Sequence, residues 1–136
     1  MCPVAHMPVF REQLGYDDLV EIRVVSGELF AGPTCAWFRL RHPLVLGEAP
    51  DPCQTVAVAA DSGNGISAVL DFERYIFVNS DLTINLLRPP QGQWICLDAR
   101  TSFGDTGSGL AESALYDEEG LVGRATQSLV MRPRES

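Results

Sequence analysis

The residue of this sequence with the clearest chemical potential is an aspartate, Asp61, which directly follows five small apolar residues at 56–60. We expect that run to be helical, so Asp61 would lie at a helix C-terminus, where the helix dipole disfavours a carboxylate. Partial burial would disfavour its ionised form further. A carboxylate in such surroundings is typical of a general base that activates water. The alternative is that Asp61 only opens an exposed turn, Asp-Ser-Gly-Asn-Gly.

Two amide side chains are candidates to act with this carboxylate. Gln127 lies in a predicted strand over 123–131, on the same face as Ala125, Leu129 and Met131. A buried amide needs hydrogen-bond partners, so Gln127 could orient a water or a substrate carbonyl. The alternative is an edge glutamine that faces solvent.

The second amide, Asn79, begins a polar stripe with a period of two residues, formed by Asn79, Asp81, Thr83 and Asn85. This spacing indicates one face of a strand. The face could carry chemistry, could be solvated, or could meet a partner subunit.

The helix that ends at Asp61 has a well-defined start. Asp51 is the expected N-cap, Pro52 suits the first helical position, and Gln54 stands where a capping box needs its partner. The body is apolar on all sides, which predicts a buried helix. Gly63 and Gly65 are expected to end it in left-handed conformations.

Strands are predicted on both sides of this helix. The ranges are 20–25 and 36–42 before it, and 75–87, 93–103, 110–116 and 123–131 after it, with hairpin turns at 104–109 and 117–120. Residues 1–15 read as a loose arm, and residues 16–136 as one domain.

The resulting order, β-β-α-β-β-β-β, defines an α+β fold. An antiparallel sheet wrapped around one central buried helix is the economical arrangement, which is the single hotdog fold. Such a sheet leaves its outer face and one edge uncovered, so we expect a homodimer or a higher homo-oligomer.

Composition excludes several partners. Eighteen acidic and ten basic residues give a net charge of −8, and every basic residue is arginine. We therefore expect no nucleic-acid partner and no lysine-dependent catalysis.

No apolar run is long enough to span a membrane. Without an apparent export signal, a cytoplasmic location with reduced thiols is expected.

The cysteines and histidines show no metal-binding spacing. The cysteines are at 2, 35, 53 and 96, the histidines at 6 and 42, so we predict neither a metal nor another cofactor. Cys53 and Cys96 lie in apolar stretches and are expected in the core. The histidine positions also argue against a hotdog dehydratase, whose base is normally a histidine near the helix.

Several segments together resemble the thioesterase-like family of actinobacteria, which is related to acyl-CoA thioesterase II. They are Ala36-Trp-Phe-Arg-Leu-Arg-His-Pro43, Asn79-Ser-Asp-Leu-Thr83, Leu87-Arg-Pro-Pro-Gln-Gly-Gln-Trp94, Asp98-Ala-Arg-Thr101 and Gly109-Leu-Ala-Glu112. Members of that family usually carry two hotdogs in tandem, and this chain looks like the C-terminal one. The resemblance therefore implies a hotdog fold, with a second subunit in place of the missing half.

The resemblance also implies an activity, the hydrolysis of acyl-CoA to a fatty acid and CoA. The Asp-Thr-Gln constellation of the family falls on Asp61, Asn79 and Gln127, with asparagine replacing threonine. Backbone amides at Gly63 and Gly65 would face the oxyanion. Other implied roles are an acyl channel and contacts to CoA phosphates, assigned respectively to Val56 and Ala60 and to Arg88 and Arg100. The alternative function is a non-catalytic hotdog that binds an acyl group or CoA, or serves as a dimerisation partner.

Overall fold

A computed structural model describes residues 4–5, 16–29, 31–63 and 73–135 of the chain. Its elements are β1 (Val4–Ala5), α1 (Tyr16–Leu19), β2 (Val20–Ser26), β3 (Thr34–Leu40), α2 (Pro52–Asp61), β4 (Tyr75–Asn79), β5 (Thr83–Leu86), β6 (Trp94–Phe103), β7 (Ser108–Asp117) and β8 (Gly120–Pro133). The strands form one antiparallel sheet in the order β1-β2-β3-β6-β7-β8-β4, and β5 also pairs with β8.

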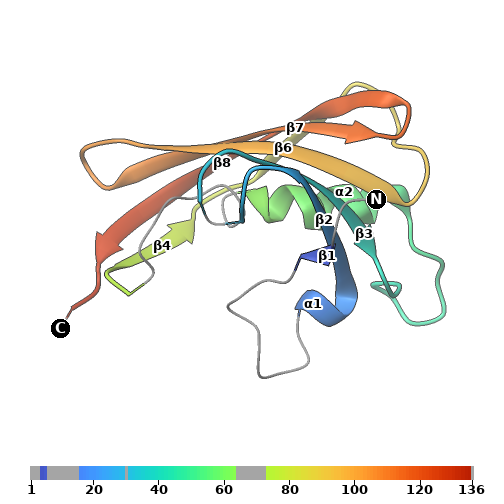
Figure 1. Cartoon of the computed structure of the whole chain (residues 1–136), viewed down its shortest axis with the longest axis horizontal. Helices are drawn as coiled ribbons and strands as arrows, with labels where there is room; N and C mark the ends of the chain where they lie inside the picture. The colour runs from blue at the N-terminus through green and yellow to red at the C-terminus, as the bar shows by residue number, and fades with distance from the viewer. Residues whose placement is uncertain (1–3, 6–15, 30, 64–72, 136) are drawn as a thin grey trace.

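The sheet arches over α2, which lies on its concave side and packs against β3, β6 and β7 (Figure 1). Alternation along the strands creates this layer. In β3, Ala36, Phe38 and Leu40 are buried, while Trp37 and Arg39 between them are only partly covered. The buried set joins Val56, Ala59 and Ala60 of α2 in one hydrophobic core. The predicted architecture of a curled sheet around one helix is therefore confirmed.

The N-terminus of α2 follows the sequence prediction closely. The Asp51 carboxylate accepts a hydrogen bond from the Cys53 N–H at 2.7 Å, and the Gln54 side chain accepts one from the Asp51 N–H at 3.2 Å. Pro52 occupies the first turn. These contacts satisfy N–H groups that have no partner within the helix.

Two predictions about α2 were wrong. The helix is not buried on all sides, because Cys53 and Ala57 are exposed on the face that turns away from the sheet. Small apolar residues there reflect helix propensity and not burial. Gly63 is not among the glycines with a positive φ, so it is not left-handed. The helix is instead capped by Ser62, which has φ −83° and ψ −5°. Gly65 lies outside the described residues.

The predicted strand 75–87 is two strands, β4 and β5. Between them the Asp81 carboxylate accepts the N–H of Ser128 at 2.8 Å, and the Ser80 N–H donates to the Ser128 carbonyl at 2.9 Å. The Asp81 side chain therefore accepts the Ser128 N–H, which in a continuous strand pairing would donate to a main-chain carbonyl. The sheet pairing resumes at Thr83, opposite Thr126.

The N-terminal segment contains two short elements that the sequence did not predict. β1 pairs with β2, and α1 immediately precedes β2. Residues 6–15 lie outside the described residues, so the proposed division into an arm at 1–15 and a domain at 16–136 stays a prediction. In the part of the chain that is described, no helix has the length and hydrophobicity needed to cross a membrane.

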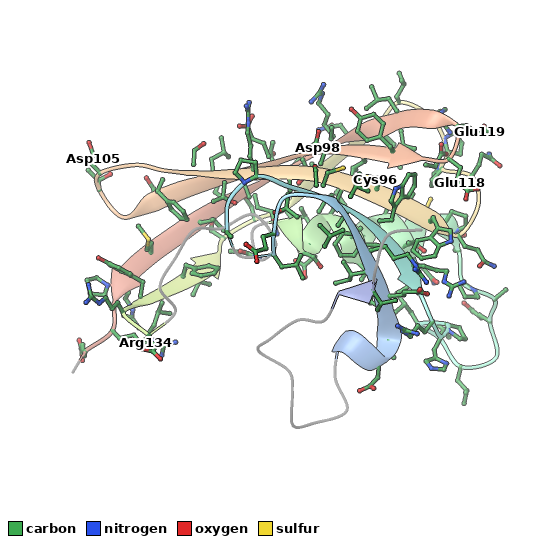
Figure 2. The ribbon with its side chains drawn as sticks, in the orientation of Figure 1. Cys96, Asp98, Asp105, Glu118, Glu119 and Arg134 are labelled. Carbon is green, nitrogen blue, oxygen red and sulfur yellow. The ribbon has the colours of Figure 1, made fainter. Side chains whose placement is uncertain are left out.

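Both predicted hairpin turns are confirmed. One joins β6 to β7 and contains Asp105, and the other joins β7 to β8 and contains Glu118 and Glu119. They lie at opposite ends of the sheet (Figure 2). The second is a two-residue turn closed by Gly120 at φ 129°, a conformation that favours glycine.

An ion pair between the half-buried Arg88 and the buried Asp117 ties the segment after β5 to this second hairpin. The Arg88 guanidinium donates to both carboxylate oxygens of Asp117 at 2.6 Å, and the main-chain N–H groups of Gln91 and Glu119 donate to the same oxygens at 2.9 Å. The Asp117 side chain is 0% exposed. The Arg88 guanidinium, helped by these two N–H groups, holds the pKa of this carboxyl well below its usual range.

The substitution Asp117→Asn tests this tie. It removes the charge while keeping the volume, so we expect a loss of about 2 kcal/mol of stability at pH 7. Because the folded pKa is depressed, the stabilisation is complete above the unfolded value near 4 and is lost as the pH falls below it. Urea unfolding at pH 7 and pH 3 measures both effects. The matched control is Asp105→Asn in the exposed hairpin, and equal unfolding midpoints for the two variants would refute the assignment.

Candidate active site

The C-terminus of α2 is joined to the sheet by a buried amide. Gln127 of β8 is 2% exposed, and its Nε2 donates a hydrogen bond to the main-chain oxygen of Asp61 at 3.2 Å. Antiparallel pairing places Gln127 opposite Ala111, and its same-face neighbours Ala125 and Leu129 are buried. The predicted inward orientation of Gln127 is therefore confirmed, and the solvent-facing alternative is wrong.

This contact has a clear physical basis. The last carbonyls of a helix have no intrahelical donor and need one from elsewhere. At the end of α2 the Ser62 N–H donates to the Ala59 carbonyl at 3.0 Å, and the Ser62 hydroxyl donates to the Val58 carbonyl at 3.0 Å. Gln127 supplies a donor for the carbonyl of Asp61. The sheet thereby holds the backbone of the residue that carries the candidate carboxylate.

The Asp61 side chain differs from the prediction in one respect. Asp61 is the last residue of α2, as predicted, but it is exposed in the single chain. The expected partial burial is therefore absent from this subunit by itself. The Gln127 amide contacts the main chain of Asp61, whereas the Asp61 side chain is exposed.

Gly63 is buried where the chain passes close to the sheet. A Cβ atom at this position would lie 2.8 Å from the Ser113 hydroxyl and 3.6 Å from Oε1 of Gln127. Glycine is thus required here by close approach and not by backbone conformation. The contact also brings Ser113 into the site, a residue that no sequence motif had indicated. Its signal was a hydroxyl on the face that Ala111 and Leu115 make apolar.

Asn79, the last residue of β4, pairs with Leu129 of β8. Directly opposite residues of antiparallel strands share a face, so Asn79 lies on the face that carries Leu129 and Gln127. It is offset from Gln127 by one same-face step, about 7 Å along the strand. The structure therefore brings Gln127 and Asp61 into contact and places Asn79 in the adjacent row, where it is exposed.

The remaining candidate residues lie apart from this contact. Val56 and Ala60 are buried in the core between α2 and the sheet. Arg88 is held by Asp117, as described above. Arg100 pairs with Glu112, with 3.4 Å between Nε and Oε2, and lies on the convex face of the sheet, opposite to Gln127. The structure does not bring either arginine to the end of α2.

Cys53, expected in the core, is an exposed residue of the first turn of α2. Cys96 is buried as expected. Within residues 4–5, 16–29, 31–63 and 73–135, no group of three or more His, Cys, Asp or Glu side chains is placed to hold a metal ion.

Comparison with known proteins identifies the family. A family model described as the acyl-CoA thioesterase C-terminal domain matches residues 2–131, so the chain belongs to that family. The resemblance found in the sequence is thereby confirmed. No curated protein matches the chain.

Solved structures share the fold. A hotdog-fold protein of unknown function from Alicyclobacillus acidocaldarius has a TM-score of 0.70 at 16% identity, covering 98% of this chain and 52% of its own. Acyl-CoA thioesterase II TesB2 from Mycobacterium marinum has a TM-score of 0.66 at 20% identity, covering 100% and 60%. A thioesterase family protein from Silicibacter pomeroyi has a TM-score of 0.66 at 15% identity, covering 93% and 94%. These similarities confirm the hotdog fold, and the chain spans little more than half of the first two proteins.

The close approach at Gly63 gives a test of the site's packing. In Gly63→Ala the added methyl meets the Ser113 hydroxyl, so we expect a destabilisation of about 1 kcal/mol. The double variant Gly63→Ala/Ser113→Ala removes the obstructing oxygen, and the nearest remaining contact is an ordinary one. Denaturant unfolding of the four proteins in this cycle should give a favourable coupling between the two sites. Additive effects would show that the residues are not in contact.

Proposed function

We propose that the protein hydrolyses acyl-CoA thioesters at the C-terminus of α2. The observation that carries the proposal is the hydrogen bond from the buried Gln127 amide to the main chain of Asp61. It joins the two residues that the family resemblance assigns to catalysis, in a chain that belongs to the acyl-CoA thioesterase C-terminal domain family.

The proposed reaction needs no covalent enzyme intermediate. The Asp61 carboxylate takes a proton from a water molecule as its oxygen attacks the thioester carbonyl carbon. The carbon–sulfur bond of the tetrahedral intermediate then breaks. The CoA sulfur leaves as a thiolate and is protonated, giving a free acid and CoA. Gln127 positions the end of the helix, and the Asn79 amide hydrogen-bonds the water.

Gly63 has a separate role in this mechanism. Because it lacks a side chain, the main chain passes close to Gln127 and Ser113. The family resemblance implies that its backbone N–H, together with that of Gly65, faces the developing oxyanion, and we propose this role for both. Gly65 lies outside the described residues. Val56 and Ala60 lie in the packed core of this subunit, so the acyl-channel role that the resemblance implies for them stays a prediction.

A second copy of the chain would complete the site. Cys53, Ala57 and Asp61 are spaced four residues apart and form one exposed face of α2. Another hotdog covering this face would exclude water from the carboxylate and strengthen its electrostatic interactions. The two longer relatives have additional chain that could supply such a half. We therefore propose a homodimer in which a second copy of the chain covers this face.

Hydrolysis of a panel of acyl-CoA thioesters, followed by release of free thiol, tests the activity. We expect Asp61→Asn to lower kcat about 100-fold or more, since it removes the general base. Gln127→Met should lower kcat less, about 10-fold, because it displaces the carboxylate without removing it. Asn79→Thr should keep or raise the rate, because it restores the residue of the resembled family.

The control for these variants is Asp105→Asn, which removes an exposed carboxylate in the β6–β7 hairpin. A wild-type rate that Asp61→Asn leaves unchanged would exclude the proposed base. A protein that binds acyl-CoA without hydrolysing it would support the alternative, a non-catalytic binding module. Asparagine in place of threonine and the exposure of Asp61 are the features that favour this alternative.

The proposed dimer predicts a solution mass of twice 14.8 kDa. Ala57→Arg places a large charge in the middle of the exposed face of α2, so we expect it to produce monomers and to reduce activity. Light scattering after size-exclusion chromatography measures the mass. Arg100→Glu, on the convex face, is the matched control and should remain dimeric. A wild-type monomer with full activity would disprove this part of the proposal.

A further inference from the structure

Two thiols meet on the convex face of the sheet, on the opposite side from Gln127. The sulfur atoms of Cys35 in β3 and Cys96 in β6 are 3.3 Å apart. The register pairs Cys35 with Asp98 and Trp37 with Cys96, so the two cysteines are diagonal neighbours on one face. Figure 2 shows Cys96 and Asp98 on the side of β6 that turns away from α2.

The two thiols differ in their surroundings. Cys96 is 5% exposed, whereas Cys35 is partly accessible. Burial raises the pKa of the Cys96 thiol, and the neighbouring Cys35 and Asp98 raise it further. An oxidant in solution therefore reaches Cys35 first, with Cys96 held behind it within contact distance.

We propose that Cys35 and Cys96 form a reversible disulfide between β3 and β6 when a peroxide is present. Disulfide sulfurs are about 2.0 Å apart, so the pair must close by about 1 Å, which side-chain rotation can supply. This modification is independent of the proposed hydrolysis, because the pair lies on the face opposite to the end of α2.

The chemistry balances in two steps. The Cys35 thiolate attacks one oxygen of hydrogen peroxide, the O–O bond breaks, and a sulfenic acid and water form after proton transfer. The Cys96 sulfur then attacks the Cys35 sulfur and displaces hydroxide, which takes the proton of the Cys96 thiol and leaves as water. Two thiols are oxidised to one disulfide, and one peroxide is reduced to two waters. A dithiol reductant reverses the change.

Cys53 provides an internal comparison. It is exposed on α2, on the concave side of the sheet. Partial desolvation, and then the neighbouring Asp51 carboxylate, raise the pKa of its thiol. Exposure alone would make Cys53 the most reactive described thiol. We instead expect the disulfide to form between Cys35 and Cys96, because each has the other's sulfur within contact distance.

The experiment treats the folded protein with a small excess of hydrogen peroxide, blocks the remaining thiols with an alkylating agent, and maps the peptides by mass spectrometry. We expect the Cys35 and Cys96 peptides to be joined, with a loss of two hydrogen atoms and no alkylation of either. Because Trp37 is paired with Cys96, its fluorescence should fall on oxidation and recover with dithiothreitol.

Three variants make the result specific. Cys53→Ser should still form the bridge. Cys35→Ser should leave Cys96 as an alkylatable thiol, whereas Cys96→Ser should leave Cys35 as a sulfenic acid that dimedone traps. The unmodified protein carries the main readout, so the test does not depend on the folding of a variant. Separate alkylation of Cys35 and Cys96 after oxidation, or bridging of either to Cys53, would overturn the proposal.

Discussion

The hydrogen bond between the Gln127 amide and the last residue of α2 is the contact on which the candidate site depends. A helix C-terminus needs donors for its free carbonyls, and a buried amide needs acceptors. One hydrogen bond meets both requirements, since Nε2 of Gln127 donates to the main-chain oxygen of Asp61 at 3.2 Å. The consequence is that a carboxylate near solvent is attached to a backbone held by the sheet, which is a way to place a reactive group accurately.

This contact depends on how closely the helix approaches the sheet. Ala59 and Ala60 are buried against the strands, and Gly63 continues the approach after the helix ends. Small residues on the buried face bring the helix within reach of a glutamine side chain. On the other side of α2, Cys53, Ala57 and Asp61 are exposed, so the site of one chain is open to solvent.

Local patterns predicted much of this arrangement. The capping box formed by Asp51 and Gln54, the alternation in β3 and the inward orientation of Gln127 all follow from short-range rules that the structure obeys. The family resemblance supplied the pairing of Asp61 with Gln127, which are 66 positions apart. No periodicity relates residues at that separation.

Other features depended on contacts that a single sequence does not display. The break at Asp81 arises because its side chain competes for the N–H of Ser128. Arg88 was a candidate for phosphate binding until the structure placed it on the buried carboxylate of Asp117. Cys53 and Ala57 are exposed because an apolar helix on one sheet has only one covered side. In each case a tertiary partner, or its absence, decided the outcome.

The most direct measurement is a crystal structure of the protein with a 2-oxoalkyl thioether of CoA, an analogue of acyl-CoA that keeps a carbonyl group but cannot be hydrolysed. We expect the carbonyl of the analogue to lie at the end of α2, within about 3 Å of a water bound by Asp61. An analogue bound on the convex face, or with its carbonyl remote from Asp61 and Gln127, would contradict it.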